Sequence, residues 1–107
     1  MGAKQCRIAI ADGTLVSGVL AFTWKDPDTI DGTEITVQLE YAPKFYWVER
    51  TGANGSVTLG ILTVTAITAN GGTVTSLILG TPASTQTADV STFRVFAVCR
   101  AEDFGGA

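Results

Sequence analysis

β-branched residues are spread along the whole chain in short runs that end at glycine, asparagine or proline. The 107 residues include 16 threonines, 10 valines and 7 isoleucines, which pack well on a pleated, half-buried surface. Helix formers are scarce, with 4 glutamates, 3 lysines and 1 methionine. Without crossover helices the strands must pair antiparallel, so we expect an all-β fold. A β-sandwich or small barrel of about 7–8 strands, with jelly-roll or immunoglobulin-like topology, fits this spacing.

The strands are expected between recognisable turn signals. Apolar and polar residues alternate from Ile35 to Tyr41, which predicts a strand with one face in the core. With Asp12-Gly13 as the first hairpin turn, further strands are expected at 6–11, 14–24, 45–50, 56–69 with a break at Gly60, 73–79 and 92–100. The last of these is apolar on both faces, so we expect a central strand that is covered on both sides.

The chain length fits one domain, 1–107, with an extended N-terminal arm (1–5) and a C-terminal tail (101–107). A hydrophobic content of 46% and a formal net charge of −3 argue against a disordered chain. No apolar run is long enough for a membrane span or a secretory signal, so we expect no membrane partner and synthesis in a cytoplasm.

The residue inventory excludes several kinds of chemistry. There is no histidine, which removes Ser-His and Cys-His catalysis and imidazole metal sites. Cys6 and Cys99 are too few for a zinc thiolate site, and their place on the first and last expected strands leaves a disulfide and two reduced thiols both open. The seven basic residues are scattered, so no nucleic-acid footprint forms. We therefore expect neither an enzyme nor a nucleic-acid-binding protein.

One loop, expected at 25–33, is rich in carboxylates. Asp26, Asp28, Asp31 and Glu34 lie within nine residues, and hard oxygen ligands at such spacing suit Ca²⁺. The loop departs from the EF-hand pattern because Ile30 takes a ligand position. A solvated acidic turn is the alternative to a calcium site, and no other cofactor is expected.

Aromatic residues cluster around the strand expected at 45–50. Alternation points Phe45 and Trp47 to one face and Tyr46 to the other, so one face lies partly outside the core unless the rings simply fill it. Aromatic and arginine side chains are common anchors of protein interfaces. We expect Phe45, Tyr46, Trp47 and Arg50 to bind a partner, together with Phe104 in the tail.

Threonine, alanine and glycine dominate much of the chain, as in LTVTAITANGGTVT at 62–75. This texture resembles small all-β virion proteins of tailed bacteriophages, of the head decoration or cement type. The resemblance implies a non-enzymatic structural protein, located in the virion, that stabilises a capsid by binding the major capsid protein and itself, often as a trimer.

Two other functions stay open. A carbohydrate-binding module would use the aromatic ledge at 45–47 to stack on sugar and the acidic loop to hold calcium. A tail or fibre component of the same kind of particle would differ only in the neighbour that it meets.

Overall fold

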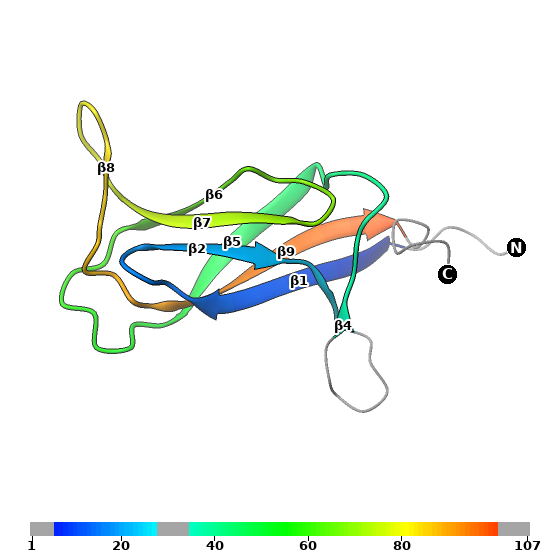
Figure 1. The fold of residues 1–107 in the computed structure, drawn as a ribbon, viewed down its shortest axis with the longest axis horizontal. Coiled ribbons are helices and arrows are strands. Elements are labelled where there is room, and N and C mark those ends of the chain that lie inside the picture. The colour runs from blue at the N-terminus through cyan, green and yellow to red at the C-terminus, as the bar shows by residue number, and fades with distance from the viewer. Residues whose placement is uncertain (1–5, 28–34, 101–107) are drawn as a thin grey trace, which may run out of the picture.

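The computed structural model describes residues 6–27 and 35–100, which form two antiparallel sheets (Figure 1). The first sheet has the order β4-β3-β1-β9-β5, and the second has the order β2-β7-β6 with β8 paired to β7. The strands are β1 (Cys6–Thr14), β2 (Val19–Thr23), β3 (Lys25–Asp26), β4 (Ile35–Thr36), β5 (Phe45–Gly52), β6 (Ile61–Thr65), β7 (Gly71–Ile78), β8 (Ser84–Thr85) and β9 (Thr92–Arg100).

The predicted all-β class is confirmed, and the layered arrangement is that of a sandwich. The described ranges contain no helix, and hence none that could cross a membrane. The expected arm (1–5) and tail (101–107) lie outside the described residues.

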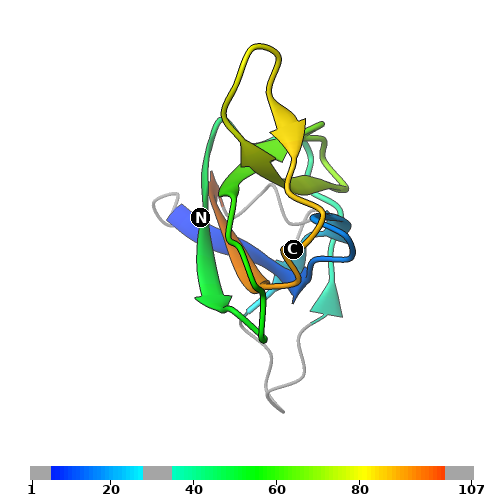
Figure 2. The same cartoon turned by 90° about the vertical axis from the view of Figure 1, so that its left-hand side faces the viewer.

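The first and last strands are neighbours in the first sheet. β1 pairs with β9 over nine residues, from Cys6 opposite Arg100 to Thr14 opposite Thr92. β5 then pairs with the other edge of β9, which makes β9 the central strand of this layer. In the end-on view the layer of β1, β9 and β5 lies across from the layer of β2, β7 and β6 (Figure 2).

The core is built from aromatic side chains between the two layers. Phe22 packs edge-on against Trp24, with ring centroids 5.1 Å apart, and also against Phe93 at 6.5 Å. Trp24 is fully buried, and its indole N–H donates to the backbone oxygen of Thr68 at 3.0 Å. Burial of each such side chain contributes about 1.5–3 kcal/mol to folding.

The first hairpin turns later than the sequence predicts. Asp12 and Gly13 continue β1, whereas Ser17 and Gly18 form the turn with φ of 51° and 82°. Two consecutive positive φ values match the right-handed twist of a hairpin. Ser17 and Gly18 therefore form a hairpin turn and not a bulge, although they lie inside a strand that the sequence predicts. Gly13 lies against the side chain of Leu20, which would have to shift to make room for a Cβ there.

The segment with the clearest alternation, 35–41, forms only a short strand. β4 covers Ile35–Thr36, and beyond it the backbone N–H of Val37 donates to Trp24 and that of Leu39 donates to Ala69. These bonds carry the segment from one layer toward the other, so no single strand pairs along it. Alternation predicted the buried Leu39, but Ile35 is exposed.

Several other expected boundaries were wrong. The strand expected at 56–69 is only Ile61–Thr65, the loop expected at 25–33 contains β3, and β8 lies where no strand was expected. Gly71 is the first residue of β7, two residues before the strand expected at 73–79. β2 passes so close to Gly71 that a Cβ there would collide with the backbone oxygen of Phe22.

β9 is central as predicted, but only one of its faces is covered. Phe93, Val95 and Ala97 point into the core, whereas Val98 on the opposite face is 37% exposed. No second layer of described residues lies over that face. The prediction of a strand covered on both sides is therefore wrong, and the uncovered face is an apolar surface.

Candidate functional site

The uncovered side of β1, β9 and β5, called the outer face here, is a regular grid of side chains. Residues directly opposite each other in neighbouring strands share a face, and every second residue along a strand returns to it. The pairing therefore sets four rows across the three strands. Row one is Ile8, Val98 and Phe45; row two is Ile10, Phe96 and Trp47; row three is Asp12, Arg94 and Glu49; row four is Thr14, Thr92 and Thr51.

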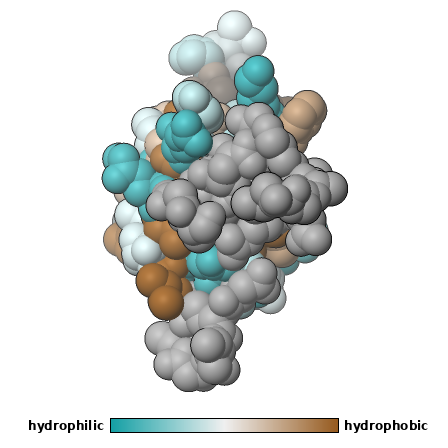
Figure 3. All heavy atoms as spheres, turned by 90° about the vertical axis from the view of Figure 1, so that its right-hand side faces the viewer, coloured by the Kyte–Doolittle hydropathy of each residue, from teal (hydrophilic) through white to brown (hydrophobic). Residues whose placement is uncertain are grey.

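Rows one and two are apolar, and four of their six side chains are exposed, whereas Phe96 is half-buried and Ile10 is buried. Phe45 is 71% exposed, Trp47 is 43% exposed, and Ile8 is 44% exposed. Trp47 stacks on Phe96 with ring centroids 5.1 Å apart and ring planes at 16°, so the face of one ring packs against the face of the other. Seen from the right-hand side of Figure 1, the described residues show hydrophobic surface next to hydrophilic surface (Figure 3). Contiguous exposed apolar side chains of this kind are typical of interaction sites.

Row three is charged but electrically balanced. Asp12 accepts from Arg94 at 3.0 Å, and Lys25 of β3 lies 3.5 Å from its other oxygen. The indole N–H of Trp47 donates to Glu49 at 3.2 Å, which links row three to row two. Two carboxylates and two cations thus alternate across the sheet with no net charge.

A shallow hollow of about 580 Å³ lies over rows three and four. Phe96 borders it on the apolar side, and Thr51 and Thr92 share a hydrogen bond of 2.9 Å at its other end. The polar side chains that line it are Asp12, Thr14, Thr51, Thr92 and Arg94.

A second polar cluster lies on the inner side, centred on the fully buried Asp89. Arg50 Nη2 lies 2.7 Å from Asp89 Oδ2, which also accepts from Ser76 Oγ at 2.6 Å and from the backbone N–H of Gly60 at 3.1 Å. The other carboxylate oxygen accepts from the backbone N–H and the hydroxyl of Ser91. The cluster therefore joins β5, β7 and the segments that precede β6 and β9.

The surroundings of Asp89 keep its carboxylate ionised. Burial alone would raise its pKa, but hydrogen bonds from Ser76, Ser91 and Gly60 outweigh burial and hold the pKa well below its ordinary value of 3.8. A buried carboxylate that is saturated with donors has no capacity to bind a substrate or to accept its proton. We interpret the cluster as structural. No sequence pattern predicts the cluster, because Asp89 stands alone in a Thr/Ser/Ala-rich segment.

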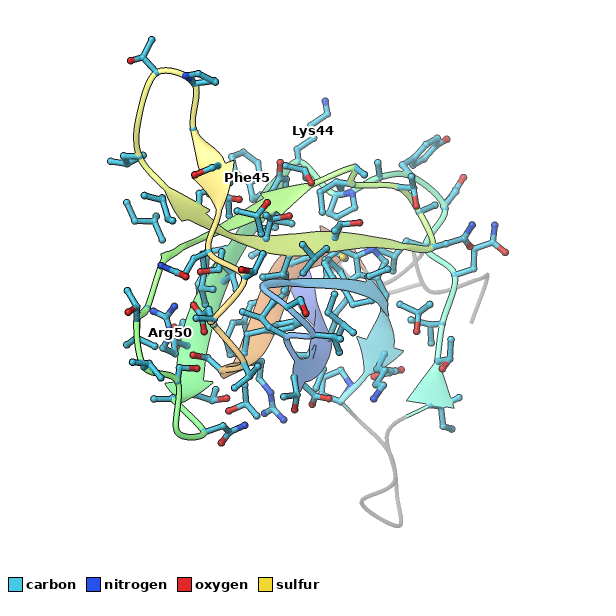
Figure 4. All side chains as sticks on the ribbon, turned by 60° about the vertical axis from the view of Figure 1, so that its left-hand side comes forward. Lys44, Phe45 and Arg50 are labelled. Carbon is cyan, nitrogen blue, oxygen red and sulfur yellow. The ribbon has the colours of Figure 1, made fainter. Side chains whose placement is uncertain are left out.

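The structure separates the four aromatic and arginine residues that the sequence grouped. Phe45 and Trp47 lie on the outer face, while Tyr46 points to the opposite side of the sheet and is still 39% exposed. Phe45 and Arg50 lie near opposite ends of β5 (Figure 4). Arg50 is engaged by Asp89, and Phe104 lies outside the described residues.

The structure describes only one member of the proposed calcium site. Asp26 lies in β3, and Asp28, Asp31 and Glu34 fall outside the described residues. Within 6–27 and 35–100, no group of three or more Cys, Asp or Glu side chains could hold a metal ion. Cys99 is buried in the core.

No protein-family model, curated protein or solved structure matches this chain. The outer face, with its exposed aromatic side chains, is the main candidate for a functional surface among the described residues.

Proposed function

We propose that this protein is a non-enzymatic structural component of a virus particle, which stabilises a capsid by binding the major capsid protein and copies of itself. The observation that carries the proposal is the exposure of rows one and two on the outer face. Exposure of apolar side chains such as Phe45 and Trp47 to water is unfavourable in free energy, and burial against another protein surface removes this penalty.

The size of the apolar surface is consistent with such binding. At 71% and 43% exposure, Phe45 and Trp47 together present roughly 250 Å² of aromatic surface. At 25 cal/mol per Å², covering it would contribute about 6 kcal/mol. This is similar to the lower estimates of the entropy cost of association, about 4 kcal/mol or more. The aliphatic members of the rows and the matching surface of the partner add to the gain.

The second sheet supports packing between subunits in another way. Thr63 pairs with Thr75, and Thr65 pairs with Thr73, on the side that faces away from the core. Threonine surfaces carry no charge, so they pack against a neighbour without desolvating an ion. A thin block with one apolar and one neutral side suits a place between the subunits of a shell, and the threonine-rich texture resembles that of phage decoration proteins.

Self-association is tested by light scattering after size-exclusion chromatography. We expect the wild-type chain to form a defined oligomer, with a trimer favoured by the resemblance. A double variant in row one, Ile8→Ser with Phe45→Ser, should run as a folded monomer. The matched control, Val57→Ser with Leu59→Ser, removes two exposed apolar side chains elsewhere and should leave the oligomer intact.

Shell binding is tested by co-sedimentation with capsids of the virus that encodes the chain, and with its isolated tails. Binding to capsids that the row-one variant loses would support the proposal. Binding to tails alone would make the protein a tail or fibre component instead. A wild-type monomer that sediments with neither particle would overturn the proposal.

A further inference from the structure

We propose that the hollow over rows three and four binds a neutral saccharide. This inference goes beyond the proposed structural function and does not depend on it, because it uses the polar half of the outer face. It rests on three properties of the hollow: its size, its hydrogen-bonding groups and its charge balance.

The size of the hollow suits a small part of a sugar chain. Its volume of about 580 Å³ falls within the range of roughly 300–1,000 Å³ that is usual for small-molecule sites. Phe96 of row two belongs to its lining, so the hollow adjoins the apolar part of the outer face. Phe96 and the parallel ring of Trp47 provide apolar surface in that direction.

The hydrogen-bonding groups match a polyol. Every sugar hydroxyl both donates and accepts, so it needs donors and acceptors side by side. Arg94 offers five N–H donors, of which one is given to Asp12 at 3.0 Å, and the carboxylate of Asp12 offers acceptors next to them. Thr14 and Thr51 add hydroxyl groups at the end of the hollow that lies away from Phe96.

The charge balance favours a ligand without charge. Asp12 and Arg94 are the two charged side chains among the described residues that line the hollow, and they pair with each other at 3.0 Å. An anion would therefore meet the carboxylate of Asp12, and a cation would meet the guanidinium of Arg94.

The strand order argues against an extended peptide in the hollow. Peptides commonly bind to sheets by adding a strand at a free edge. β9 lies between β1 and β5, so the backbone of Thr92, Phe93 and Arg94 under the hollow is already paired on both sides. A ligand must use side chains there, as a saccharide does.

The test follows backbone amide signals by NMR during titration with cellohexaose, maltohexaose, xylohexaose and hexa-N-acetylchitohexaose, with hexagalacturonate as a charged comparison. We expect at least one neutral hexasaccharide, at millimolar concentration, to shift the amides of Thr14, Thr92 and Arg94. The absence of shifts there with all four neutral sugars would overturn the inference. Shifts caused only by the charged sugar, or located only elsewhere, would overturn it as well.

A conservative variant tests the side chains. Thr14→Val with Thr51→Val keeps the shape of two side chains and removes their hydroxyls, so the Kd for the bound sugar should rise about tenfold. The matched control, Thr65→Val, makes the same change at an exposed position on β6 and should leave the Kd unchanged. An unchanged Kd in the Thr14/Thr51 variant would contradict the assignment.

The same variants separate this inference from the proposed structural function. The row-one variant, Ile8→Ser with Phe45→Ser, should lose self-association and keep the sugar-dependent shifts. The Thr14/Thr51 variant should keep self-association and bind the sugar about tenfold more weakly.

Discussion

Arg50, which is half-buried, forms an ion pair with the fully buried Asp89, with Nη2 and Oδ2 2.7 Å apart, although the two residues lie 39 positions apart along the chain. Arg50 also donates to the backbone oxygen of Gly60 at 2.8 Å. Through Ser76 the pair reaches β7, so one carboxylate ties both sheets and two loops together. Much of the cooperativity of folding should depend on this cluster.

Replacing Asp89 with asparagine should destabilise the fold strongly. The side chain keeps its size, but Arg50 loses its counter-charge and the donors around Oδ2 lose an anionic acceptor. Removing one partner of a buried pair costs about 3–5 kcal/mol. Urea unfolding measures the loss, and Glu40→Gln, an exposed control, should change stability by less than about 0.5 kcal/mol. Similar stabilities for the two variants would contradict the role of the cluster.

The stability of the protein should fall in acid because of Asp89. The unfolded chain takes up a proton at the ordinary pKa of 3.8, whereas the folded chain takes it up only at much lower pH. The contribution of Asp89 is therefore complete well above pH 3.8 and decreases as the pH falls below that value. The slope approaches about 1.4 kcal/mol per pH unit. Urea unfolding at several pH values should show a shallower acid slope for Asp89→Asn, and equal slopes would argue against this assignment.

The two tryptophans should differ sharply in their effect on stability. Trp24 is fully buried and bonded to Thr68, so Trp24→Ala should cost about 3–5 kcal/mol. Trp47 lies on the outer face, and Trp47→Ala should cost about 1 kcal/mol, mainly through the lost contact with Phe96. Denaturation followed by circular dichroism compares them. A larger loss for Trp47 would mean that the outer face belongs to the core.

Tryptophan fluorescence should report self-association directly. In Trp24→Phe the remaining indole of Trp47 lies in water in the monomer, so its emission should shift to shorter wavelength as protein concentration rises. In Trp47→Phe the buried Trp24 should keep a constant emission over the same range. A constant emission from Trp47 would place any oligomer interface away from the outer face.

Two glycines with similar backbone angles should respond differently to alanine. Gly18 and Gly55 have φ of 82° and 78°, so alanine meets a similar backbone strain of about 1–2 kcal/mol at both. A Cβ on Gly18 would also collide with the backbone oxygen of Gln86, whereas Gly55 has nothing within 4 Å. Gly18→Ala should therefore lower the melting temperature more than Gly55→Ala. Equal decreases in melting temperature would show that backbone strain alone causes the loss of stability.

Composition and alternation predicted the fold class because they reflect local preferences that the structure keeps. The strand at 45–50, the turn at Asn54-Gly55 and the central position of β9 could all be predicted this way. The first turn was misplaced, because Asp12-Gly13 and Ser17-Gly18 are both good local turn sequences. Close packing of Leu20 against Gly13 belongs to the tertiary structure, and no local pattern encodes it.

The outer face was only partly predictable from the sequence. Alternation placed Phe45 and Trp47 together, but it could not show which face of the sheet is left uncovered, because that depends on where the second sheet packs. The rows that join them to Ile8 and Arg94 depend on the pairing of strands far apart in sequence. The contact between Arg50 and Asp89 could not be predicted for the same reason, since Asp89 lies 39 positions further along the chain.

Rows one to four contribute little to the interior: of their twelve members, only Ile10, at 4% exposure, is buried. Single substitutions at the exposed positions of this surface should therefore change the stability of the fold only slightly. Descendants of such a chain could change what they adhere to while keeping the same folded body.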